Sequence, residues 1–84
     1  MRILRETAPT IEEYREKVKR VLLDDYKQYT PDEVENMIKS DDGKMIIEDR
    51  YNHNLTMFEN NEITRADFLK IGIRAAAFCI DMCF

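Results

Sequence analysis

Apolar and polar residues alternate along this chain with a helical period over nearly its whole length. In four separate stretches apolar side chains recur at steps of three and four residues, which places them on one side of a helix. The pattern predicts three longer helices, over about 10–29, 43–60 and 64–83, and one short helix over about 31–39. We therefore expect an all-α fold, a small bundle of these four helices.

Three of the predicted helices begin with the same local signal. Thr10, Thr30 and Thr64 are each followed three positions later by an acidic residue. In this pattern the threonine and the acid satisfy free backbone N–H groups of the first helical turn. Pro31 follows Thr30, and proline suits the first helical position because its missing N–H is not needed there. The three threonines are thus the predicted N-caps.

The predicted helix over 64–83 is apolar around most of its circumference. After Asp67 its charged residues are Lys70, Arg74 and Asp81, which share one narrow strip of the helix surface. One neighbouring face cannot cover the remaining apolar side chains, so we expect this helix to be central or shared with a second copy of the chain. We expect the chain to self-associate as a homo-oligomer, and the candidates for this surface are Phe78, Ile80, Met82 and Phe84.

Two residues interrupt the apolar stripes. Asn54 falls within the stripe of the third predicted helix, and it must find a partner or lie at an interface because unpaired burial costs about 1–3 kcal/mol. Gly72 is less favourable than alanine inside a helix by about 1 kcal/mol. Together with Ala75 and Ala76 it would allow close approach of another backbone.

Length and composition indicate a single soluble domain. The chain has 84 residues and a mass of 10.0 kDa, so we expect one domain over 1–84, with 1–8 an extended or mobile N-terminal segment. Hydrophobic residues make up 44% and charged residues 36%, which argues against disorder. The longest apolar run, 75–80, is far shorter than the roughly 20 residues of a membrane span. Because the start also lacks the apolar core of a secretory signal, we expect a cytoplasmic protein without membrane association.

No group of residues predicts catalysis or metal binding. Cys79 and Cys83 share a helix face, but structural zinc needs four ligands, and His53 is the only histidine. Ser40 lies in a predicted turn without a base beside it, and neither thiol lies beside a cation. We expect a non-enzymatic protein with no metal, no cofactor and two reduced, packed cysteines.

Charge is distributed unevenly along the chain. The formal net charge is -4, yet residues 31–62 hold nine acidic and three basic side chains. Such a block is either a solvated face or an acidic surface that attracts a basic protein partner and competes with nucleic acid for it. The candidates for this partner-binding face are Asp32, Glu33, Glu35, Asp41, Asp42, Glu48 and Asp49.

The helices over 31–39 and 43–60 can alternatively be read as a helix-turn-helix. The second of them carries Glu48 and Asp49 near its start, where a DNA-binding helix needs Lys or Arg. We therefore expect no direct nucleic-acid binding. The basic footprint left for such binding would be Arg2, Arg5, Arg15, Lys19 and Arg20.

In size, acidity and helical outline the chain resembles the small helical accessory proteins of phages and mobile elements, a group that includes anti-CRISPR inhibitors. The resemblance rests on the start Tyr29–Val34 and on the segment Arg50–Ile80 with its turn Asn60–Thr64, about half of the chain. It implies a non-enzymatic binder that blocks or adapts a larger host or viral protein, and it transfers no functional residue. The alternatives are a homodimeric structural module and, after it, a helix-turn-helix-like DNA-binding regulator.

Overall fold

The computed structural model describes residues 7–84, and within this range it contains helices and no strands. The elements are α1 (Ile11–Asp25), α2 (Pro31–Lys39), α3 (Asp41–Glu59), α4 (Arg65–Asp67), the π-helical segment η1 (Phe68–Gly72) and α5 (Ile73–Cys83). Because α4, η1 and α5 follow one another without a break, they form together the helix predicted over 64–83. The prediction of a small all-α bundle is confirmed.

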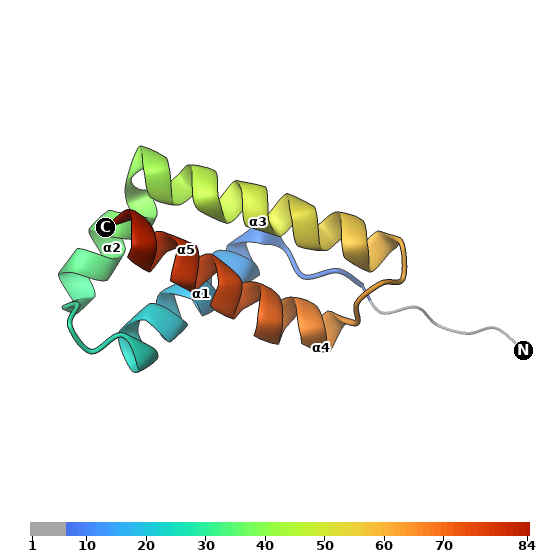
Figure 1. Ribbon diagram of the computed structural model, residues 1–84, viewed down its shortest axis with the longest axis horizontal. Coiled ribbons are helices and arrows are strands. Elements are labelled where there is room, and N and C mark those ends of the chain that lie inside the picture. Colours follow the sequence, from blue (N-terminus) through green and yellow to red (C-terminus); the bar gives the residue numbers. More distant parts are fainter. Residues whose placement is uncertain (1–6) are drawn as a thin grey trace, which may run out of the picture.

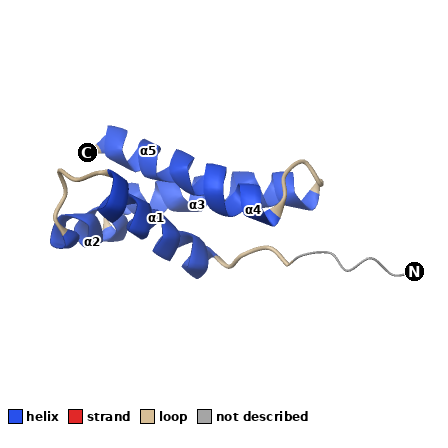
Figure 2. Cartoon of the chain, turned by 90° about the horizontal axis from the view of Figure 1, so that it is seen from below, coloured by secondary structure: helices blue, strands red, loops and turns tan. Residues whose placement is uncertain are grey.

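The helices pack as a bundle closed at one end by the short helix. α3 and the α4–α5 stretch run side by side in opposite directions, and α1 packs against α5 and α3 (Figure 1). α2 contacts α1 and α3 and lies at the end of the bundle where α5 ends (Figures 1 and 2). The turn between α3 and α4 lies at the opposite end (Figure 1).

The predicted threonine caps begin α1, α2 and α4. The side-chain oxygen of Thr10 accepts a hydrogen bond from the backbone N–H of Glu13 at 3.1 Å. Thr30 and Thr64 each form a complete capping box with the acid three positions later. Since each cap joins residues within one helical turn, the local sequence is sufficient to specify it.

α1 ends at Asp25, earlier than the predicted end near Tyr29. Tyr26 has already left helical geometry, with φ -109° and ψ 84°. Thr30 precedes a proline and must be extended, so the chain has to leave the helix before it. The acidic pair that ends α1 is also unfavourable at the negative end of the helix dipole. Tyr26 and Tyr29 lie in the turn after α1. Their positions nevertheless fit the helical spacing of apolar residues, because both side chains pack against the core.

A single residue, Ser40, separates α2 from α3, and α3 begins at Asp41 rather than at the predicted position 43. The Ser40 hydroxyl donates to the Met37 carbonyl oxygen at 2.7 Å and accepts from the Gly43 N–H at 3.0 Å. A Cβ at Gly43 would collide with the Met37 carbonyl oxygen. Glycine therefore lets the two helices meet closely here and does not interrupt α3.

The segment before α1 is held against two helices. Residues 1–6, most of the predicted N-terminal segment, lie outside the described residues. Arg65 Nε donates to the Thr7 carbonyl oxygen at 3.1 Å, and the Tyr51 hydroxyl donates to the Pro9 carbonyl oxygen at 2.7 Å. These two hydrogen bonds attach the segment before α1 to α4 and to α3.

A buried polar contact joins α1, α3 and η1 inside the bundle. The Tyr14 hydroxyl lies 2.9 Å from the Gly72 carbonyl oxygen and 3.1 Å from Asn54 Oδ1, and it donates its hydrogen to these acceptors. Burial raises the pKa of Tyr14 above its ordinary value. A Cβ at Gly72 would lie 2.6 Å from Asn54 Oδ1. Asn54 has therefore found the partner it needed, and Gly72 allows a close approach, although of a side chain rather than of a backbone.

Candidate protein-binding surfaces

Four of the predicted acidic residues lie in first helical turns. Asp32 and Glu33 begin α2, Asp41 and Asp42 begin α3, and all four are exposed. Carboxylates are favourable there because the N-terminal end of a helix carries partial positive charge. Glu33 also closes the capping box, since its Oε1 accepts from the Thr30 N–H at 3.0 Å. Helix formation alone is thus a sufficient reason for these four acids.

Glu35, another of the predicted partner-binding acids, is paired with two lysines. Its Oε2 lies 2.6 Å from Lys19 Nζ, and its Oε1 lies 3.2 Å from Lys39 Nζ. The hydrogen bonds from Lys19 and from Lys39 lower the pKa of Glu35. Two ammonium groups thus lie against this one carboxylate and offset its charge.

Glu48 and Asp49 are exposed on the side of α3 that faces away from the core. Asp41 and Glu48 are seven positions apart, as are Asp42 and Asp49, so each pair lies along one side of the helix. Met45 lies between the two pairs, and 57% of it is exposed. We call these five residues the acidic surface of α3.

The helix formed by η1 and α5 has a second apolar face that residues 7–84 leave exposed. Ile71, Phe78 and Met82 are 66%, 53% and 71% exposed, and their spacing of seven and four places them on one side. We call these three residues the apolar stripe. Phe78 and Met82 were predicted for self-association, whereas Ile71 was missed, although its spacing from Phe78 was a usable signal. The prediction for Ile80 is corrected, because its side chain is fully buried in the core.

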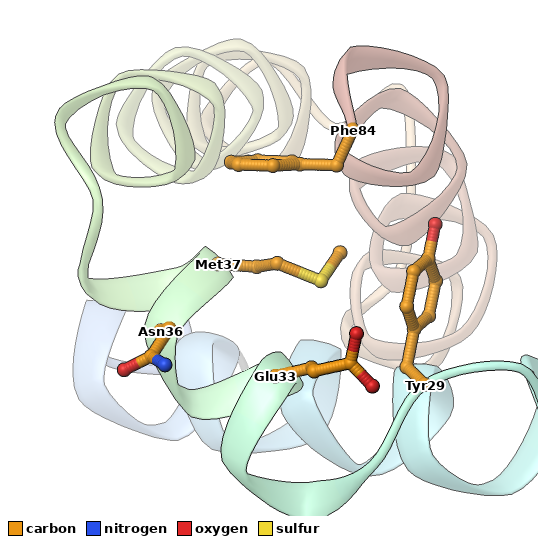
Figure 3. A pocket seen from close by; sticks show the side chains of 5 residues that line it. All are labelled: Tyr29, Glu33, Asn36, Met37 and Phe84. Carbon is orange, nitrogen blue, oxygen red and sulfur yellow. The ribbon is translucent and has the colours of Figure 1, made fainter.

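Phe84, the remaining self-association candidate, lies at a pocket instead of on the apolar stripe. The pocket has a volume of about 340 Å³, lies between α2 and the end of α5, and is lined by Tyr29, Glu33, Asn36, Met37 and Phe84 (Figure 3). The rings of Phe84 and Tyr29 border it on two sides, with the Met37 thioether between them (Figure 3). The Tyr29 hydroxyl donates to Asp81 Oδ1 at 2.6 Å, and this bond raises the pKa of Tyr29.

The residues considered for metal binding or catalysis are not gathered into a site. Among residues 7–84, no group of three or more His, Cys, Asp or Glu side chains is arranged to hold a metal ion. Cys79 is partly exposed and Cys83 is exposed, so the expectation that both are packed is corrected for Cys83. The Ser40 hydroxyl is engaged at the α2–α3 junction. His53 lines a pocket of about 230 Å³ between α3 and η1, together with Arg50.

The geometry gives little support to a helix-turn-helix. α2 and α3 are joined by Ser40 alone, whereas the motif uses a turn of about three or four residues. Of the basic footprint, Arg2 and Arg5 lie outside the described residues, and Lys19 is paired with Glu35.

No protein family, curated protein or solved structure matches the chain. None of the helices formed by residues 7–84 is long and apolar enough to span a membrane.

Proposed function

We propose that this protein is a non-enzymatic interaction module that binds a basic surface of a partner protein through the acidic surface of α3. The observation that carries the proposal is the placement of Glu48 and Asp49. Unlike the acids of the first turns, they are not needed to begin a helix, and unlike Glu35 they form no ion pair among the salt bridges found within residues 7–84.

The composition of this surface suits a protein partner. Four carboxylates lie within Asp41–Asp49, against one ammonium group, that of Lys44. Opposite charge on a partner accelerates encounter and fixes orientation. Met45, exposed among these acids, supplies an apolar centre, and binding interfaces commonly combine such a centre with a polar rim.

An acidic surface of this kind also supports an inhibitory role like that of anti-CRISPR proteins. Carboxylates and phosphates both carry negative charge, so a protein surface that binds nucleic acid through Lys and Arg also attracts the acidic surface of α3. Occupation of that surface would exclude the nucleic acid. The protein itself would be repelled by DNA and RNA.

The test is a charge reversal on α3 with a matched control elsewhere. A partner is isolated from host extract, and its association rate is measured over a salt series with Glu48→Lys/Asp49→Lys and with Glu16→Lys/Glu62→Lys. The control makes the same charge change at exposed positions of α1 and of the α3–α4 turn. We expect the α3 variant to associate about tenfold more slowly or worse at low salt, with the difference shrinking as salt rises. Equal rates for the two variants would contradict the proposal.

A second candidate function, a homodimeric module, is favoured by the apolar stripe. Arg74 and Asp81 flank Phe78 on the same strip of the helix, four positions before it and three after it. If two copies pack antiparallel with Phe78 at the centre, Arg74 of each copy lies opposite Asp81 of the other. An apolar centre with opposite charges on its two sides is self-complementary, as a two-fold interface requires.

Sedimentation equilibrium at micromolar concentration tests this second candidate. The dimer should be lost in Phe78→Glu and kept in Met45→Glu, which places the same charge at an equally exposed position outside the apolar stripe. A monomeric wild-type protein would rule out the homodimer and leave the apolar stripe without a second copy to cover it.

A further inference from the structure

We propose that the pocket between α2 and the end of α5 is an arginine pocket, which takes the guanidinium group of an arginine side chain on the basic partner. The inference rests on the proposed function, because it names the group through which a basic protein would be anchored. The pocket residues come from the α1–α2 turn, from α2 and from the residue after α5 (Figure 3).

The walls of the pocket suit a flat cation. Phe84 and Tyr29 contribute aromatic rings and Met37 a thioether (Figure 3). Guanidinium groups stack on aromatic rings and are attracted to their negative faces. The Tyr29 hydroxyl donates to the Asp81 carboxylate at 2.6 Å, which shifts electron density toward the ring and strengthens its attraction for a cation.

The charge of the pocket also selects a cation. The Glu33 carboxylate lies next to the Tyr29 ring, on the far side of the Met37 thioether from Phe84 in the view of Figure 3. One of its oxygens, Oε1, accepts from the Thr30 N–H, and Oε2 remains able to accept from a guanidinium group. None of the five lining residues is basic, so nothing in the lining neutralises this carboxylate. An apolar side chain in the pocket would partly remove the carboxylate from water without replacing its hydrogen bonds, which is unfavourable.

Arginine fits this combination better than lysine does. A guanidinium group is planar and weakly hydrated, so it can stack on a ring and donate to a carboxylate at the same time. An ammonium group is compact and strongly hydrated and loses more on leaving water. The pocket thus predicts a preference for arginine among basic side chains.

The test uses three small probes of similar shape. n-Butylguanidinium, n-butylammonium and the neutral n-butylurea are titrated into the full chain, and binding is followed by the NMR shift of the Met37 methyl group. We expect n-butylguanidinium to bind more tightly than n-butylammonium and n-butylurea to cause no saturable shift. Equal binding of n-butylurea and n-butylguanidinium would overturn the proposal.

Variants identify the groups that bind the probe. Glu33→Gln keeps the capping box, since glutamine also serves at this position, but removes the charge. It should weaken n-butylguanidinium binding about two- to fivefold, as expected for an exposed ion pair. Phe84→Leu should weaken it as well, whereas Asp32→Asn, an exposed acid of the same turn outside the pocket, should not. Unchanged binding by Glu33→Gln would overturn the proposal.

The same variants distinguish an error in the arginine-pocket proposal from an error in the proposed function. Glu48→Lys/Asp49→Lys should leave binding of n-butylguanidinium unchanged, because neither residue lines the pocket. If Glu33→Gln binds the probe and the partner as the wild type does while the α3 variant loses the partner, the arginine pocket is wrong and the acidic surface stands. If the pocket binds the probe but both variants bind the partner normally, the acidic surface is wrong, and the pocket has no role in this partner's recognition.

Discussion

The helix formed by η1 and α5 has apolar side chains on two opposite faces, and the bundle covers only one of them. The inner face carries Ile73, Ala76 and Ile80, which are 0–1% exposed. The outer face carries the apolar stripe, whose members are all more than half exposed. Side chains of similar hydrophobicity thus have different roles: the inner ones stabilise the fold, and the outer ones are available for contact with another molecule.

The largest expected difference between the two faces is in stability. Ile80→Ala should lower the free energy of unfolding by about 2–5 kcal/mol, because it leaves a cavity in the core. Met82→Ala should change it by less than about 0.5 kcal/mol, as is usual for an exposed position. Urea denaturation followed by circular dichroism, at a concentration where the chain is monomeric, measures both. Similar losses would show that the outer face also contributes to the core.

The next largest change in the free energy of unfolding is expected when the hydrogen bonds of the Tyr14 hydroxyl are removed. Tyr14→Phe removes the hydrogen bonds to the buried Gly72 carbonyl oxygen and to the half-buried Asn54 Oδ1, and this loss should cost about 1–3 kcal/mol. Because the pKa of Tyr14 is raised in the folded protein, the unfolded chain loses this proton first as pH rises. Stability should therefore be full below pH about 10, the ordinary tyrosine value, and fall above it. The fall should be shallower in Tyr14→Phe, and identical alkaline profiles would contradict the assignment.

A smaller change in the free energy of unfolding is expected for Gly72→Ala. Whether this substitution destabilises or stabilises the fold should depend on the Asn54 side chain. Crowding against Asn54 Oδ1 should cost Gly72→Ala about 1–3 kcal/mol, offset by about 1 kcal/mol of helix propensity, for a net loss of about 1 kcal/mol. In an Asn54→Ala background the obstacle is gone, and the same change should stabilise. A double-mutant cycle by denaturation measures this, and additive changes would contradict the close approach.

The smallest effect concerns the thiols at the end of the helix. Cys83→Ala should change stability by less than about 0.5 kcal/mol, because Cys83 is exposed. Cys79 is partly covered, so it should react with a thiol reagent more slowly than Cys83 in the folded protein. Equal labelling rates would mean that the end of α5 opens readily.

The helix starts could be predicted from the sequence because each depends on a contact within one turn. Thr10, Thr30 and Thr64 cap their helices in the way their spacing indicated. The end of α1 could not be predicted in the same way. Tyr26 and Tyr29 keep a helical spacing while they contact the core from a turn, and periodicity does not distinguish the two cases.

The faces of the last helix could not be assigned from the sequence either. When apolar residues surround a helix, their pattern does not say which of Ile71 and Ile80 faces the core. The answer depends on where α1 and α3 pack. Asn54 was recognisable as a residue that needs a partner, but the partner lies forty positions away in Tyr14. The pocket likewise brings together Tyr29 and Phe84, which no local signal connects.

The α2–α3 junction bears on the order in which the chain folds. The Ser40 hydroxyl is hydrogen-bonded to Met37 and to Gly43, each only three positions away along the chain. Closing so short a loop loses little chain entropy, whereas bringing α5 against α1 closes one of about fifty residues. We expect the corner between α2 and α3 to form while the rest of the chain is still unfolded. It would then offer α1 and α5 a preformed surface on which to assemble.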